Sequence, residues 1–244
     1  MKLSIFTLLL LGSPLIAADE GAEAAAEKAT ESFPYVGSWQ GRKVDSKDGV
    51  GIGTCVLISP NWILTAAHVA SPLSKDPASR IVTIEFPGAK RRAIEAHLAD
   101  GADIALARLD KPITEIKPAS ILSMALEKDR DGEVTFTIVG TSGGRHAFPA
   151  AKGYGEGVKA FRPKDSSSSV AFGKAGDSGG AWMLQTAEVP LLFGIIHGGI
   201  KQGDKAFGVA VQPAAFQPWI IKTLAKTGDV ASWCPMKEPA KDKK

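Results

Sequence analysis

The chain has 244 residues, 44% of them hydrophobic, which is ordinary for a globular protein and enough for a sizeable core. Its 29 basic and 26 acidic side chains leave a formal net charge of +3. A balance so close to neutral gives no support to nucleic-acid or membrane-surface binding, and we expect neither class of partner.

Residues 1–18 predict a secretory signal peptide. Lys2 provides a short positive start, residues 3–11 are almost wholly apolar, and residues 15–18 offer small side chains for cleavage. Residues 12–14 interrupt the apolar run well short of the roughly 20 residues that a membrane-spanning helix needs. We therefore expect a soluble protein that is secreted or periplasmic, with a formal charge of +2 once the signal is removed.

A leader or pro-segment is expected at residues 19–32, which are rich in alanine and acids. From Phe33 onward, short apolar runs alternate with turn residues, a pattern typical of a β-barrel or sandwich. The expected strands cover residues 51–59, 62–66, 81–86, 93–98, 104–109, 134–139, 157–161, 169–172, 181–184, 190–197 and 206–211. Clear helical character in this region is confined to residues 213–226, and the boundary between two halves is expected near residues 113–122.

Three short segments together indicate nucleophilic catalysis. In chain order they are Thr-Ala-Ala-His at residues 65–68, Asp-Ile-Ala-Leu at 103–106 and Gly-Asp-Ser-Gly-Gly at 176–180. A serine hydroxyl needs a base to remove its proton, and the base needs a buried carboxylate to set its tautomer and stabilise the imidazolium. The segments offer His68, Asp103 and Ser178 for these roles.

Each of these residues also has a plainer interpretation. Ser178 could be an incidental serine in a glycine-rich turn, and His68 a structural histidine after a buried strand. Asp103 could pair with a backbone N–H or with Arg108. In the catalytic interpretation, the backbone N–H groups of Gly176 and Ser178 form an oxyanion hole.

The remaining groups of this kind, His97, His146 and Asp100, are expected at the surface. No set of side chains shows metal-ligand spacing, so the sequence predicts no metal and no cofactor.

The segments at 65–68, 103–106 and 176–180 resemble those of the chymotrypsin/trypsin-like serine peptidase family in order and approximate spacing. The resemblance covers roughly residues 33–221 and points to a secreted, bacterial-type member. It implies an all-β fold of two packed six-stranded antiparallel barrels with a C-terminal helix, and hydrolysis of protein or peptide substrates through an acyl-enzyme. On this basis we expect an N-terminal barrel at 33–118, a C-terminal barrel with the terminal helix at 119–226, and a tail at 227–244.

The substrate pocket departs from the family pattern. Phe172 stands where relatives selective for Lys or Arg carry an aspartate, so trypsin-like selectivity is not expected. Gly199 and Gly208 match pocket-wall positions, and His197 stands where the family usually has a serine that contacts the triad aspartate. We expect an apolar pocket closed by Phe172, while His197 could touch Asp103, line the pocket or point elsewhere.

Other departures concern what holds the site together. Many relatives begin their mature chain with Ile-Val-Gly-Gly, whose amine pairs with the acid before the serine; this sequence has no such segment, so Asp177 lacks that partner. The usual disulfide beside the histidine is missing, because Val69 follows His68 and Cys55 is offset. Cys55 and Cys234 could form a disulfide in an exported chain or remain free thiols.

Two other classes of protein fit part of the pattern. Gly-x-Ser-x-Gly at residues 176–180 also fits the nucleophile elbow of α/β-hydrolases, but that fold needs the order Ser, acid, His and alternating helices. After Ser178 the chain offers only Glu188 followed by His197, without those helices. A non-catalytic binding protein on a protease scaffold is the main alternative, although such proteins usually lose a triad member.

Overall fold

The computed structural model describes residues 31–46, 50–155, 159–163, 174–202 and 205–236. The expected signal peptide, nearly all of the expected leader, the strand expected at 169–172 and the last eight residues lie outside this part of the chain.

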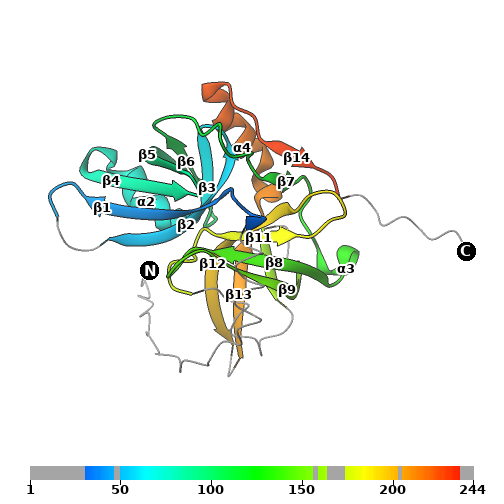
Figure 1. The fold of residues 1–244 in the computed structure, drawn as a ribbon. Coiled ribbons are helices and arrows are strands. Elements are labelled where there is room, and N and C mark those ends of the chain that lie inside the picture. Colours follow the sequence, from blue (N-terminus) through cyan, green and yellow to red (C-terminus); the bar gives the residue numbers. More distant parts are fainter. Residues whose placement is uncertain (1–30, 47–49, 156–158, 164–173, 203–204, 237–244) are drawn as a thin grey trace, which may run out of the picture.

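Six antiparallel strands form a closed barrel from the first half of the described chain (Figure 1). They are β1 (Val36–Lys43), β2 (Gly51–Ser59), β3 (Trp62–Thr65), β4 (Arg80–Phe86), β5 (Ala89–Leu98) and β6 (Ala105–Leu109), in the order β1-β2-β3-β6-β5-β4. Branched and aromatic side chains suit such strands because they pack well on a pleated, half-buried surface. Leu57, Ile63, Ile84 and Leu106 are fully buried inside the barrel.

The second half forms another ring of six antiparallel strands. They are β8 (Val134–Gly140), β9 (His146–Gly155), β10 (Ala160–Pro163), β11 (Ala181–Leu184), β12 (Leu191–Gln202) and β13 (Lys205–Val211). Their order is β11-β8-β9-β10-β13-β12, and a pairing of β11 with β12 closes the ring. Its core contains Phe136, whose ring centroid lies 4.8 Å from that of Trp182 and 5.2 Å from that of Phe193.

Two short strands extend this second sheet with parallel pairings. β7 (Ser120–Leu122) pairs with β12, and β14 (Ser232–Cys234) pairs with β7. β14 lies within the range expected for a tail, 227–244, so regular structure continues to Cys234.

The described helices are short. They are α2 (Ala67–Lys75), α3 (Lys128–Asp131) and α4 (Gln217–Leu224), with 3-10 turns η1 (Pro77–Ser79), η3 (Pro213–Phe216) and η4 (Ala225–Thr227). The helix expected near residues 213–226 is confirmed, but α2 was not expected, because Pro72 within it reads as a helix breaker. Among the described residues, no helix has the length and apolarity needed to cross a membrane.

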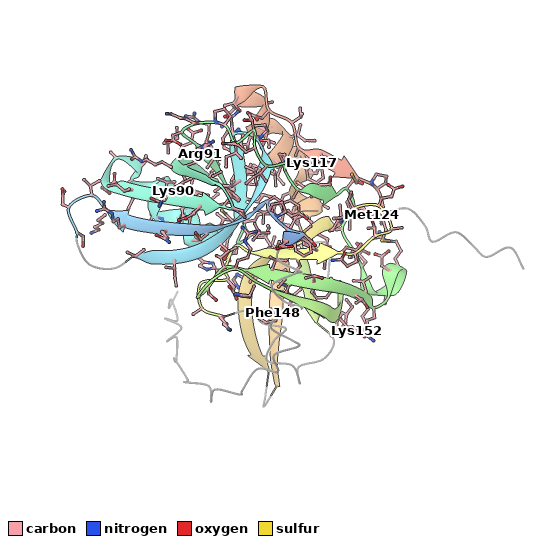
Figure 2. All side chains as sticks on the ribbon, viewed as in Figure 1. Lys90, Arg91, Lys117, Met124, Phe148 and Lys152 are labelled. Carbon is pink, nitrogen blue, oxygen red and sulfur yellow. The ribbon has the colours of Figure 1, made fainter. Side chains whose placement is uncertain are left out.

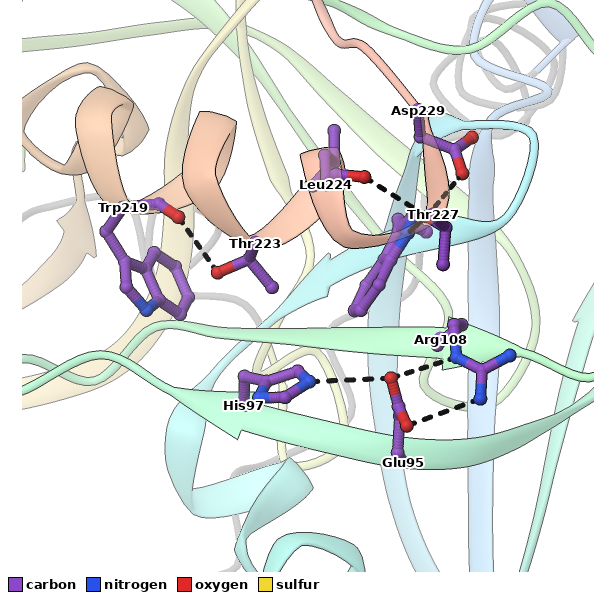
Figure 3. A network of polar contacts seen from close by, with 9 residues as sticks. Glu95, His97, Arg108, Trp219, Thr223, Leu224, Thr227 and Asp229 are labelled. Carbon is purple, nitrogen blue, oxygen red and sulfur yellow. Dashed lines mark hydrogen bonds and ion pairs between the residues drawn. The ribbon is translucent and has the colours of Figure 1, made fainter.

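The C-terminal segment is anchored on the first barrel. Ile220 and Leu224 of α4 are buried in a core cluster that contains the apolar side chains of that barrel together with some from the second barrel. The indole N–H of Trp62 donates to Thr227 Oγ1 at 2.7 Å, and Asn61 Nδ2 donates to Asp229 Oδ2 at 3.0 Å. Figure 3 shows Thr227 and Asp229 beside strands of the first barrel.

The all-β class with a C-terminal helix is confirmed, and most expected strands are present. The strands missed include β1 and β9, in which Gly37 and Gly41, and Gly153 and Gly155, interrupt the apolar pattern. In the folded sheet their backbones pair normally with neighbouring strands.

The two cysteines remain free thiols, so the suggested disulfide is not formed in this structure. Cys55 is buried in the core of the first barrel, and its Sγ–H donates to Gly37 O at 3.4 Å. Cys234 packs against the aromatic core of the second barrel. Each thiol therefore belongs to a different core cluster, and burial raises the pKa of Cys55 far above its usual value.

Candidate active site

His68 is positioned by the end of one strand and the start of a helix. β3 ends at Thr65, two alanines follow, and His68 is the second residue of α2. Its backbone N–H donates to Asp103 Oδ1 at 2.8 Å, and its ring Nδ1–H donates to Asp103 Oδ2 at 2.7 Å. With Nδ1 holding the proton, Nε2 of a neutral ring is left as the acceptor.

Asp103 also accepts a hydrogen bond from a second histidine. His197 Nδ1–H, on β12, donates to the same Oδ2 at 2.5 Å. The Asp103 side chain is 17% exposed, and burial alone would raise its pKa. Hydrogen bonds from His197 and His68 outweigh burial and hold the pKa of Asp103 well below its usual value, so the carboxyl is ionised. Arg108 instead donates to Glu95 at 2.9 Å.

The same three side chains form a group with the composition of a metal site. Ligand atoms of His68, Asp103 and His197 lie within 4.8 Å of one another. Ligands of a tetrahedral zinc ion stand about 3.3 Å apart, since each lies about 2.0 Å from the metal. The nitrogens are closer than that to Asp103 Oδ2, at 2.7 and 2.5 Å, which is hydrogen-bond spacing.

The loop that carries Ser178 is held by both barrels. Thr54 of β2 donates its N–H to Ser178 O at 2.8 Å and its Oγ1–H to Gly176 O at 2.9 Å. On the other side, Gly179 N–H donates to Ile196 O of β12 at 2.8 Å. Gly179 has a φ of +86°, and a Cβ there would lie 2.1 Å from Thr54 O, so only glycine fits.

The backbone N–H groups of this loop fall into two sets. Those of Asp177, Gly179 and Gly180 each donate to a backbone carbonyl. Those of Gly176 and Ser178 have no hydrogen-bond partner in the part of the chain that the structure describes. These are the two donors that the sequence assigns to an oxyanion hole, and both remain available to a ligand.

His68 and Ser178 line one cavity of about 280 Å³. Its other walls are mainly apolar and come from β1, β2, α2 and β4; they include Trp39, Ile52, Leu73 and Val82. No hydrogen bond joins Ser178 Oγ to His68 among the described residues. Catalytic hydrogen bonds are often long before substrate binds and tighten in the complex.

Within the described ranges of the chain, Arg80 is the one arginine or lysine that lines this cavity. Its Nε is buried and has no hydrogen-bond partner within the described residues. Sequence reasoning did not find Arg80, because an arginine at the start of a strand carries no motif.

Val69, the residue after His68, packs against Gly53 of β2, and no disulfide links the described chain at this place. A Cβ on Gly53 would lie 2.7 Å from Val69 Cγ1. The valine side chain therefore fills the space between β2 and α2 beside His68, and van der Waals packing takes the place of a covalent link.

Asp177, next to the serine, is nearly inaccessible, with its side chain 1% exposed. Its Oδ1 accepts from the N–H groups of Thr141 and Ser142, at 3.1 and 3.0 Å. Its Oδ2 accepts from Lys174 N–H at 2.6 Å and from His146 Nε2–H at 2.9 Å. The expectation that His146 is a surface group is therefore wrong, because its side chain is 15% exposed and lies against a buried carboxylate.

The other expected surface groups and pocket residues are placed as follows. Asp100 is exposed, while His97 is half-buried beside Glu95. Gly199 on β12 pairs directly with Gly208 on β13, and His197 lies just before them. Phe172 lies outside the described residues. Among the residues expected to form the substrate pocket, His197 therefore contacts Asp103. Gly199 and Gly208 are paired with each other between β12 and β13.

Comparison with known proteins agrees with this geometry. The model of the trypsin-like peptidase domain family matches residues 53–190, more than half of the chain, a range that includes His68, Asp103 and Ser178. No curated protein matches the chain. The matched range covers most of the folded region, with parts of both barrels and the site built on His68, Asp103 and Ser178. The chain therefore belongs to the trypsin-like peptidase domain family.

Proposed function

We propose that this protein is a serine endopeptidase that uses Ser178, His68 and Asp103 as its triad. One observation carries the proposal: His68, fixed by two hydrogen bonds to Asp103, lines the same cavity as Ser178. The unpaired N–H groups of Gly176 and Ser178 support it, since an acyl-transfer site needs donors for the oxyanion.

The proposed reaction begins at His68. Its Nε2 removes the proton from Ser178 Oγ as the oxygen attacks the carbonyl carbon of the substrate. The carbonyl oxygen becomes an oxyanion and accepts hydrogen bonds from the N–H groups of Gly176 and Ser178. The tetrahedral intermediate collapses when His68 gives its proton to the leaving amine, and an acyl-enzyme remains on Ser178.

Hydrolysis of the acyl-enzyme repeats these steps with water. His68 takes a proton from the water molecule, whose oxygen attacks the ester carbonyl, and then returns the proton to Ser178 Oγ. Asp103 keeps the proton of His68 on Nδ1 and stabilises the imidazolium that forms in each half-reaction, without itself becoming protonated.

The cavity beside α2 is proposed to take the part of the substrate that follows the scissile bond. His68 must reach the leaving amine, so the leaving part lies on the side of His68. The cavity walls from α2 and the first barrel are on that side. The acyl part would then lie along β12 near Gly199, with a selectivity other than for Lys or Arg, as Phe172 suggests.

Export is part of the proposal. It rests on residues 1–18, which have the features of a signal peptide, and makes the protein secreted or periplasmic. The substrates would be proteins or peptides outside the cytosol. The proposed division of the chain keeps an N-terminal barrel at 33–118 and a C-terminal barrel with its helix at 119–226.

Replacement of the nucleophile tests the proposal. Ser178→Ala should lower kcat on a protein substrate roughly a million-fold, because the triad acts as a unit. A fluorophosphonate probe should label the wild-type chain at Ser178 and leave the variant unlabelled. Ser123→Ala, a half-buried serine beside β7, is the matched control and should behave as wild type.

Two outcomes would contradict the proposal. If Ser178→Ala retains wild-type hydrolysis, the assignment of the nucleophile is wrong. If the folded wild-type protein neither hydrolyses peptides nor reacts with the probe, a binding protein on a peptidase scaffold is the better description.

A further inference from the structure

The contact between His146 and Asp177 lies directly under the loop that carries Ser178. His146 is the first residue of β9, and Phe148, two residues later on the same strand, packs against its ring at a centroid distance of 5.0 Å. The position of Phe148 can be followed in Figure 2. The two side chains of the pair, 15% and 1% exposed, are well shielded from water.

The ring of His146 has a partner at each nitrogen. Nε2 lies 2.9 Å from the carboxylate of Asp177, and Nδ1 lies 3.0 Å from the carbonyl oxygen of Gly144. Both partners are hydrogen-bond acceptors, so the ring is held between them. His146 and Asp177 therefore form a shielded hydrogen-bonded pair.

The carboxylate of Asp177 is ionised and fully used. Burial alone would raise its pKa, but the hydrogen bonds from His146 and from backbone N–H groups outweigh burial, and its pKa lies below the usual value. A carboxylate has about four lone-pair sites, and Asp177 accepts four hydrogen bonds, two on each oxygen. All four donors belong to residues 141–174.

The pair of His146 and Asp177 is packed against bare backbone. A Cβ on Gly140 of β8 would lie 2.2 Å from Asp177 Oδ1 and 2.8 Å from His146 Nε2. Gly140 is the pairing partner of His146 between β8 and β9. The absence of a side chain at this position makes room for the pair, so the sheet itself sets the place of Asp177.

We propose that His146 is a positioning residue for the nucleophile loop: through its hydrogen bond to Asp177 it holds Gly176 and Ser178 in the shape that binds the oxyanion. The inference rests on the proposed function and adds to it a residue outside the triad that keeps the site in its active shape. The loop is ordered by a side chain of the folded domain. It therefore does not need a free chain terminus to fill the place beside Asp177.

Few charged groups face this pair. Lys174 contributes only its backbone N–H, and β8 offers Gly140 and Thr141, which carry no charge. Arg145, the neighbour of His146, directs its guanidinium to the carbonyl oxygens of Phe33 and Val36. In the described part of the chain, Asp177 is therefore the charged group that the His146 ring contacts.

Two variants of His146 separate the hydrogen bond from the bulk of the side chain. Gln can still donate one N–H to Asp177, whereas Leu removes the donor. His146→Leu should lower kcat about 100-fold with little change in KM, the size expected for a disturbed oxyanion hole. His146→Gln should stay within about tenfold of wild type. His97→Leu, at the half-buried histidine beside Glu95, is the control and should keep the wild-type kcat.

One measurement does not depend on turnover. Hydrogen exchange at the amides of Gly179 and Gly180 should be faster in His146→Leu than in His146→Gln. If wild type hydrolyses nothing, the proposed function fails, and this measurement still decides whether the pair orders the loop.

The proposal is overturned if His146→Leu keeps the wild-type kcat and loop exchange. If neither variant folds, Gly140→Ala decides, because its Cβ would meet Asp177 and His146. It should lower kcat and speed the exchange of both amides, and wild-type values for both would refute the coupling.

Discussion

Two histidine–carboxylate pairs flank the same serine, and they differ in exposure. In the first pair, the side chains of His68 and Asp103 are 50% and 17% exposed. In the second, those of His146 and Asp177 are 15% and 1% exposed. The donor–acceptor distances are nearly equal, 2.7 and 2.9 Å, so the distance between the partners does not distinguish their roles.

The difference lies in the second ring nitrogen. Nε2 of His68 accepts no hydrogen bond from a described residue and faces a cavity that also contains Ser178. Nδ1 of His146 donates to Gly144 O, so neither nitrogen of that ring is free. An imidazole with a free nitrogen can take up and release a proton, whereas one with both nitrogens engaged can only hold its neighbours in place. The same pair of residue types thus suits chemistry in an open setting and positioning in a closed one.

The largest effect should come from breaking the more exposed pair, His68–Asp103, which we call the open pair. Asp103→Asn should lower kcat on the order of ten-thousand-fold, because an amide no longer sets the tautomer of His68. Steady-state kinetics on a peptide substrate measures the loss. Asp100→Asn, an exposed neighbour, is the control. An Asp103→Asn enzyme within tenfold of wild type would remove His68–Asp103 from the mechanism.

A smaller effect is expected from the second histidine of the open pair. The hydrogen bond to Asp103 raises the pKa of His197, although burial opposes the shift. Protonated His197 is therefore present below that raised pKa and is lost as pH rises through it. While present, it places a positive charge beside the carboxylate oxygen that His68 also contacts.

His197→Ser removes this cation and leaves a neutral donor for Asp103. The acid limb of the pH–rate profile should move to higher pH by up to about one unit. Measurement of kcat/KM from pH 4 to 9 tests the shift, with His97→Ser as the control. An acid limb that stays in place would mean that His197 does not act on His68.

The smallest expected effect concerns substrate selectivity, and it involves only the cavity beside the His68–Asp103 pair. Arg80 lies on the cavity of the open pair, and its buried Nε has no partner. An acidic residue after the scissile bond could accept a hydrogen bond from it, which would favour such substrates about tenfold. Arg80→Gln should abolish that preference without changing kcat on neutral peptides.

A library of peptides varied after the scissile bond measures this preference. Arg92→Gln, at an exposed arginine on β5, is the matched control. Equal cleavage of acidic and neutral peptides by the wild-type enzyme would show that Arg80 is not part of substrate recognition.

Sequence patterns predicted strands with strong apolar runs and missed β9, in which glycine and proline interrupt the pattern. β2 and β11 have the predicted bounds, although β2 has two glycines, Gly51 and Gly53, near its start. β9 contains Pro149, Gly153 and Gly155, which local rules assign to turns, and is nonetheless paired on both sides in the sheet. Helix α2 was missed for a similar reason, since Pro72 lies within it.

The sequence predicted those site residues that lie in recognisable motifs. His68, Asp103 and Ser178 each lie in a short segment of characteristic residues, so their proximity was an inference from pattern. His146 lies in no such segment, and its partner Asp177 is 31 residues away. Arg145 and His146 read as polar residues of a surface turn, and only the pairing of β8 with β9 turns His146 toward the buried acid.

The amino-acid sequence by itself determined the all-β class, the order of the three motif residues and the position of the terminal helix, because these follow from local apolar runs, glycines and small residues. Tertiary structure decided which carboxylates meet the other two histidines of the site, His146 and His197. His197 reaches Asp103 across 94 residues and His146 reaches Asp177 across 31, and both contacts depend on strand pairings that bring distant backbone together. A hydrogen bond needs atoms within about 3 Å, and only the closed sheets specify distances on that scale.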